Sequence, residues 1–287
     1  MTKTDPLLAS WYASGRQHGG SGCLAAIPSL PCFRVSSQVF QTMLCIKILA
    51  PVPGTDRLKR CVCGYAYQPL LQNGVHFFSS CEQCSQVSSR HNRLLPIIQR
   101  AMREISREVT EGETANWLPG NRALRPFDKI TVEPPSVDGG MSQLIGYDVG
   151  VADPTRLGRL SPGTPYFQSG DASRRMQRRK TSRFNGDVSR FGPLSRAVKF
   201  VPLIFEVTGS MGPNAKSEFD KWCKEAAALV TQQGGQNYRA LDLPHTWNAM
   251  KFSNLYSQMI SFSIVRDTAM TVMRAVERAA AAANSEC

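Results

Sequence analysis

Four cysteines and two histidines lie between positions 61 and 92, the densest grouping of such side chains in the chain. Thiolates and imidazoles at short spacings are the donors that a tetrahedral Zn²⁺ site needs. We predict a set made of Cys61, Cys63, His76 and Cys81, in which a short turn brings His76 and Cys81 to one ion. Four protein ligands leave no coordination position for a substrate, so the predicted zinc is structural.

Cys84 leaves the ligand set open. Cys81 and Cys84 are separated by two residues, a spacing typical of zinc sites, and a four-cysteine set would omit His76. Packing of reduced cysteines as small apolar side chains is the alternative without metal. The first 20 residues contain no apolar signal segment, so we expect an intracellular protein, nuclear or cytoplasmic, with thiols rather than disulfides.

Carboxylates further along the chain suggest a second kind of ion. Asp128 begins a predicted strand and Asp148 lies within another, so the two can converge on Mg²⁺, which prefers oxygen ligands. Such an ion activates water for attack on a phosphodiester. Lys180 follows in a basic segment, and Glu206 at the end of a third strand is an additional candidate acid. As alternatives, Asp128 caps a turn and Asp148 faces solvent.

The charge of the chain favours a polyanionic partner. Lys and Arg number 34 against 22 Asp and Glu, which gives a net charge of +12 and a pI near 9.5. We therefore expect DNA as the partner, with RNA as the alternative, and no membrane, because the apolar runs are too short to span a bilayer. The predicted phosphate contacts are Arg174, Arg175, Arg178, Arg179 and Arg183. The alternative is that these arginines form only a solvated helix face.

The elements that position these residues follow from apolar periodicity. Residues 1–22 are predicted to be a flexible start. Asn92 is the predicted N-cap of a helix that runs to about residue 109, with Pro96 in its first turn, and a linker follows. Strands are expected at 129–132, 144–152 and 199–207, and helices at 36–49, 174–183, 216–232 and 252–283. Together they predict an α/β fold.

The order of the Cys/His motifs resembles that of a known family. The motifs are Cys61-Val62-Cys63-Gly64, then His76 and Cys81, then Arg90-His91-Asn92. This succession resembles the C-terminal region of non-LTR retrotransposon proteins of the site-specific, restriction-like-endonuclease type. In those polyproteins a Cys-Cys-His-Cys zinc motif follows the reverse transcriptase and precedes a nuclease of the PD-(D/E)xK superfamily. Residues 24–28 resemble a phrase that those proteins carry before the zinc motif.

The downstream motifs extend the resemblance over roughly residues 21–280. Residues 125–128 are similar to the family's Arg-Pro-Asp signature with one inserted residue, Phe127. Asp148 occupies the place of the second metal-binding acid. Residues 180–184 resemble a Lys-x-x-Lys-Tyr element, which implies that Lys180 is the catalytic lysine.

The last motif lies in residues 200–209, which resemble the strand before the closing helices, where a glutamate such as Glu206 is typical. The resemblance implies a restriction-endonuclease-like core, a small mixed sheet flanked by helices, at residues 92–285. Before this core, the resemblance implies a tail at 1–55 that follows a lost polymerase, and then a zinc-binding module at 56–91. The function that the resemblance implies is that of a Mg²⁺-dependent DNA endonuclease.

Three departures from the family pattern motivate a second hypothesis. Phe127 interrupts the Pro-Asp pair, and Gly150 stands where the superfamily's simplest form has its lysine. Arg183 replaces a lysine and cannot release a proton as a base. The chain also contains no polymerase motif with paired aspartates. The alternative is therefore a catalytically decayed module that binds nucleic acid without cutting it, and a third reading is an element remnant without a selected role.

Overall fold

The computed structural model describes residues 6–26, 30–79, 81–84, 86–105, 107, 109–111, 127–133, 142–155, 170–187, 198–232 and 252–285. Four strands form one mixed sheet in the order β1-β2-β3-β4, comprising Val109–Glu111, Lys129–Glu133, Gln143–Ala152 and Val198–Glu206. β1, β2 and β3 are antiparallel neighbours, whereas β4 is parallel to β3. The helix between β3 and β4 is the long crossover that a parallel pair requires.

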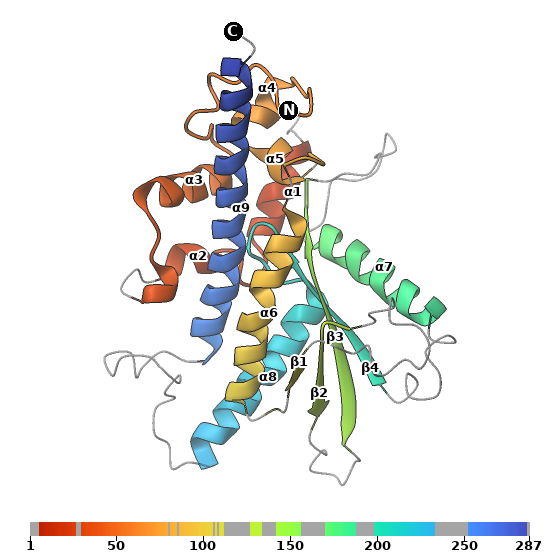
Figure 1. Ribbon diagram of the computed structural model, residues 1–287. Helices are drawn as coiled ribbons and strands as arrows, with labels where there is room; N and C mark the ends of the chain where they lie inside the picture. The colour runs from red at the N-terminus through yellow and green to blue at the C-terminus, as the bar shows by residue number, and fades with distance from the viewer. Residues whose placement is uncertain are drawn as a thin grey trace, which may run out of the picture.

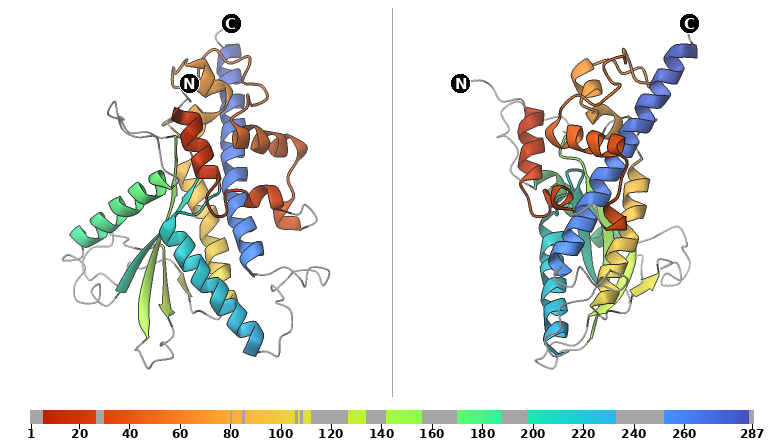
Figure 2. Two further views of the ribbon diagram at one scale, coloured as in Figure 1. Left: turned by 180° about the vertical axis from the view of Figure 1, so that it is seen from behind. Right: turned by 90° about the vertical axis from the view of Figure 1, so that its left-hand side faces the viewer.

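Helices cover both faces of this sheet (Figure 1). α7 (Asp171–Asp187) lies on one face, and α6 (Val87–Glu104), α8 (Pro213–Gln232) and α9 (Phe252–Ser285) lie on the other (Figure 2). The two faces of β3 differ accordingly. Tyr147 packs edge-on against Trp222 of α8 at 5.9 Å and donates a hydrogen bond to Glu218. Gly150, on the opposite face of the pleat, lies under α7.

The Cys/His segment forms a small module beside the C-terminal half of α9 (Figure 1). It contains α4 (Gln68–Gln72) and α5 (Val75–Ser79), and every residue of α5 is buried. A methyl group on Gly74 would lie 3.0 Å from Val272 of α9, so the turn before α5 touches that helix closely. The predicted mixed α/β architecture with a Cys/His module is thus found.

The N-terminal segment differs from the prediction of a flexible start. Residues Pro6–Gly15 form α1, followed by α2 (Gly22–Ala25), the 3₁₀ turn Pro31–Phe33 and α3 (Ser37–Ile48). Hydroxyl groups attach α1 to the ends of the sheet strands, since Ser10 donates to the carbonyl of Pro154 and Ser14 lies 2.5 Å from the Thr208 hydroxyl. Sequence periodicity missed α1 because these contacts are tertiary.

One apolar core joins this segment to the module and the sheet. Trp11 of α1 is only 2% exposed, packs on Phe78 of α5 with ring centroids 5.7 Å apart, and donates its indole N–H to the carbonyl of Lys47. The core is therefore continuous through the three regions at 1–55, 56–91 and 92–285. Within the described residues, no helix combines the length and apolarity needed to cross a bilayer.

The burial of Trp11 gives a direct test of this attachment. Trp11→Ala is expected to lower the free energy of unfolding by about 3–5 kcal/mol, because it removes a fully buried indole and leaves a cavity. Urea denaturation followed by circular dichroism measures the change. Tyr12→Ala is the matched control, since Tyr12 is 50% exposed on the same helix. Equal effects of the two substitutions would contradict the packing of α1.

The helix predicted from Asn92 is wrong at both ends. α6 begins at Val87 and ends at Glu104, so Asn92 lies inside it and Pro96 is in its interior rather than its first turn. The start of α6 has no side-chain cap and is held by a tertiary contact instead. Arg90, which is 3% exposed, donates to the carbonyl of Phe78 at 3.0 Å. Residue 109 belongs to β1, which the sequence did not predict.

Candidate functional site

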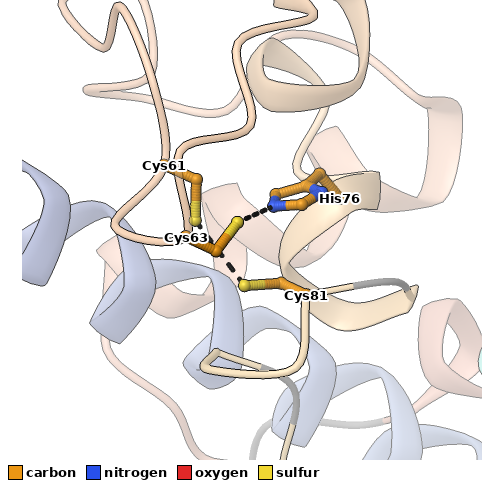
Figure 3. A group of neighbouring side chains, drawn as sticks. All are labelled: Cys61, Cys63, His76 and Cys81. Carbon is orange, nitrogen blue, oxygen red and sulfur yellow. Dashed lines mark hydrogen bonds between the residues drawn. The ribbon is translucent and has the colours of Figure 1, made fainter.

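The predicted zinc ligands come together in the folded chain (Figure 3). The donor atoms of Cys61, Cys63, His76 and Cys81 all lie within 4.8 Å of one another. The sulfur atoms of Cys61 and Cys81 are 3.6 Å apart, and the Cys63 sulfur is 3.2 Å from Nε2 of His76. Tetrahedral zinc with bonds of about 2.3 Å to sulfur separates its sulfur ligands by roughly 3.8 Å. The donor set therefore fits zinc, and the group could hold such a metal.

Local backbone geometry presents these ligands. The Cys61 N–H donates to the carbonyl of Tyr65 at 2.8 Å, and Gly64 supplies the positive φ of +86° that this turn requires. The Tyr65 ring stacks on the His76 ring at 4.0 Å with an interplanar angle of 4°. Burial lowers the pKa of His76, which favours the neutral imidazole that binds metal.

Cys84 lies beside the group without joining it. Its sulfur is 3.7 Å from that of Cys61, and the residue is only 1% exposed. Burial raises the pKa of Cys84 to about 11. Burial would also raise the pKa of Cys81, but hydrogen bonds from neighbouring thiols outweigh it and lower that pKa. Because four donor atoms converge without Cys84, the geometry favours His76 over Cys84 as the fourth ligand.

The structure also brings Asp128 and Asp148 together. The pairing of Lys129 with Tyr147 places Asp128, the residue before β2, directly opposite Asp148 of β3, and Asp128 N–H donates to the Tyr147 carbonyl at 2.8 Å. Burial raises the pKa of Asp148, the ammonium of Lys180 opposes this shift, and the nearby Asp128 carboxylate adds to it. The strand register therefore places the two acids on neighbouring strands at the same level of the sheet. Residues 125 and 126 of the predicted motif lie outside the described residues.

Lys180 reaches this pair from α7. Its Nζ donates to Oδ1 of Asp148 at 2.5 Å and to the carbonyl of Val149 at 3.1 Å. Gly150 makes the approach possible, because a methyl group there would lie 3.0 Å from Cε of Lys180 and 3.0 Å from Sδ of Met176. The departure at Gly150 thus has a physical explanation: the lysine stem from α7 occupies the space above this glycine.

His91 is the residue that the sequence reasoning missed. Its Nε2 lies 2.9 Å from Oδ2 of Asp128, which also accepts the Val149 N–H at 2.7 Å. The hydrogen bond to Asp128 raises the pKa of His91 against the effect of burial. Burial would raise the pKa of Asp128, but His91 and the Val149 N–H outweigh it, so that pKa is lowered. The Arg90-His91-Asn92 motif is the available signal, but the sequence pattern around it indicates only a helix start.

Glu206 is not brought to the acidic pair. It pairs with Ala152, whereas Asp148 pairs with Pro202, so Glu206 lies four residues or about 13 Å along the strand. Its carboxylate is buried and accepts hydrogen bonds from Ser173 N–H at 3.0 Å and the Gln17 amide at 3.1 Å. Glu206 therefore caps the start of α7, where a negative charge is favourable, instead of completing the site.

The predicted phosphate-binding arginines all lie on α7. Arg174 is half-buried and paired with Asp171 at 2.6 Å. Arg175, Arg178, Arg179 and Arg183 are exposed. The helix thus turns Lys180 inward to the carboxylates and presents guanidinium groups outward. Among the described residues, the Cys/His group is the one cluster of three or more metal-donor side chains, and Asp128 and Asp148 belong to no such cluster.

Phe127, the inserted residue of the acidic motif, has a packing function. It is 6% exposed and lies against Phe184 and Phe200 at ring centroid distances of 5.5 and 6.0 Å. A methyl group on Gly146 would lie 2.3 Å from its ring. Gly146→Ala is therefore expected to cost about 1–3 kcal/mol of unfolding free energy through overpacking, measured by thermal or urea unfolding.

Gly186 provides the control for this substitution. It lies in α7, and a methyl group added there would meet no atom within 4 Å, so Gly186→Ala should be neutral or stabilising by up to about 1 kcal/mol. A Gly146→Ala variant as stable as Gly186→Ala would show that Phe127 does not pack over β3.

Comparison with known proteins identifies no relative. No family model, no curated protein and no solved structure matches this chain.

Proposed function

We propose that this chain is a Mg²⁺-dependent DNA endonuclease related to the restriction-like endonucleases of non-LTR retrotransposons, in the PD-(D/E)xK superfamily. The observation that supports this most strongly is the meeting of Asp128, Asp148 and Lys180. Asp148 comes from β3, Lys180 from α7 and Asp128 from the position before β2, and Asp128 and Lys180 are 52 positions apart in sequence (180 − 128). A small mixed sheet flanked by helices carries them, in keeping with the restriction-like expectation.

The chemistry assigns a distinct role to each group. Asp128 and Asp148 would hold Mg²⁺, which when bound activates water and stabilises charge on the attacked phosphodiester. Lys180 places an ammonium group at Asp148, where it can orient the attacking water and offset developing negative charge. The Cys61, Cys63, His76 and Cys81 group would hold zinc as a structural ion that stabilises the module next to α6.

The outward face of α7 would bind the DNA backbone. Exposed guanidinium groups, such as those of Arg178 and Arg179, make phosphate contacts that carry little sequence information. Binding through them is expected to weaken steeply with salt, because it releases counterions from the DNA. RNA presents the same phosphate chemistry and is the alternative polyanion.

Plasmid nicking in the presence of Mg²⁺ tests the proposal. Asp128→Asn and Asp148→Asn should each slow nicking by roughly 10²–10³-fold, the scale of losing a main electrostatic contribution in an active site. Asp220→Asn is the matched control, because this acid on α8 is 47% exposed and pairs with Lys216 of the same helix. Equal nicking by wild type and the Asp128→Asn, Asp148→Asn double variant would exclude catalysis at this site.

A nucleic-acid-binding module without catalysis is the second candidate. The observation that favours it is the ion pair at 2.5 Å between Lys180 and Asp148, which occupies one carboxylate oxygen that a cation would need. Gel-shift binding that persists in EDTA, with no nicking when Mg²⁺ is supplied, would select this candidate. Binding that requires the metal, together with nicking, would select the nuclease.

A further inference from the structure

Asp128 is held by donors on one of its two carboxylate oxygens. Oδ2 accepts from Nε2 of His91 at 2.9 Å and from the N–H of Val149 at 2.7 Å. A carboxylate oxygen has about two lone-pair positions, so these two donors use the capacity of Oδ2. The side chain is 22% exposed and therefore within reach of solvent. Oδ1 is left as the oxygen that can face Asp148 and a cation.

His91 is itself held in place on α6. Its Nδ1 lies 3.0 Å from the side-chain oxygen of Asn92, and its side chain is 27% exposed. The preceding residue, Arg90, ties the same turn of α6 to the carbonyl of Phe78 at 3.0 Å. Phe78 lies on α5, the helix that also carries His76. The imidazole is thus a fixed group between α6 and the start of β2.

We propose that His91 is a positioning residue of the carboxylate site, which orients Asp128 by occupying Oδ2 so that Oδ1 is presented to the cation. The inference rests on the proposed function, because it assumes that Asp128 and Asp148 bind a divalent ion. It goes beyond that function by assigning a fourth side chain, from a fourth element, to the site. Partners that orient metal-binding groups typically change metal affinity by 10–100-fold when they are removed.

Two amide substitutions separate a positioning role from a structural one. The amide nitrogen of Gln extends about as far as Nε2 of histidine and can donate to Asp128, whereas that of Asn is one carbon shorter and cannot. Both substitutions replace the imidazole ring by an uncharged amide, so the two variants differ mainly in the reach of the donor. His91→Gln should therefore keep the orientation of Asp128, and His91→Asn should lose it.

The experiment measures binding of Mn²⁺, as a spectroscopic substitute for Mg²⁺, to the full chain by electron paramagnetic resonance. We expect His91→Asn to weaken Mn²⁺ binding by 10–100-fold and His91→Gln to bind within a few-fold of wild type. The rate of plasmid nicking at subsaturating metal should rank the three proteins in the same order, and their affinity for DNA should be unchanged. The His18→Asn variant is the matched control, since His18 packs on Phe219 away from the acids.

The outcomes are distinguishable. Equal Mn²⁺ affinity in wild type, His91→Gln and His91→Asn would overturn this inference alone. If wild type binds no Mn²⁺, or if its Mn²⁺ binding persists in Asp128→Asn and Asp148→Asn, the proposed function is overturned and the inference falls with it. Circular dichroism of each variant identifies a folding defect. If His91→Asn does not fold, His91→Ala, which also lacks the donor, replaces it and must show the same 10–100-fold loss of Mn²⁺ affinity; wild-type affinity in that variant would overturn the inference.

Discussion

Removing metal from the Cys/His group is expected to unfold the module around it and to lower the melting temperature of the whole chain. α4 and α5 have five residues each, too short to be stable as isolated helices, so we expect metal coordination to help to hold them. In small zinc modules the metal contributes about 10–16 kcal/mol of apparent binding free energy. Packing of α5 on α9 retains part of the order, which makes the expected loss here smaller.

This prediction is tested by metal content and thermal unfolding. Purified protein should contain one zinc per chain, and a chelator should lower the melting temperature measured by circular dichroism. Cys63→Ser should reproduce that loss, whereas Cys223→Ser, on α8 and outside the group, should change neither quantity. A metal-free protein with the same melting temperature would mean that the thiols simply pack as apolar groups.

Lys180→Met is expected to slow Mg²⁺-dependent nicking by roughly 10²–10³-fold with little change in DNA affinity. Methionine retains an unbranched apolar stem above Gly150 but removes the ammonium that contacts Asp148 and the Val149 carbonyl. The proposed positive charge beside the reacting phosphate is lost, while the outer face of α7 is unchanged. Single-turnover nicking and fluorescence anisotropy with labelled DNA separate the two effects.

Arg179→Met is the matched control for this substitution. Arg179 is the neighbouring residue of α7 but is exposed, so its loss should weaken DNA binding and leave the nicking rate at saturating DNA nearly unchanged. If Lys180→Met behaves like Arg179→Met, Lys180 is only another phosphate contact. That outcome would favour the binding module over the nuclease.

Strands and long helices could be predicted because their signals are local. The alternating pattern of residues 144–152 corresponds to β3, and the helix expected at 36–49 corresponds to α3, whose first turn is capped by Ser36 accepting from the Val39 N–H. α1 could not be predicted, because tertiary contacts hold it: Trp11 packs on α5, and the Ser10 and Ser14 hydroxyl groups bond to residues that follow the strands. Likewise, the start of α6 depends on a contact of Arg90 with Phe78, and no capping residue marks it.

By itself, the sequence predicted a Cys/His metal group with its fourth ligand left open between His76 and Cys84, because metal donors are few and their spacing is informative. It also singled out Asp128, Asp148 and Lys180 as candidates for a second site. Only the tertiary structure decided which of them meet. It placed Cys84 beside the Cys/His group, Glu206 at the start of α7 and His91 beside Asp128. The physical reason is that side chains far apart in sequence, 23 positions for Cys61 and Cys84, 33 for Ser173 and Glu206 and 37 for His91 and Asp128, become neighbours only through tertiary packing.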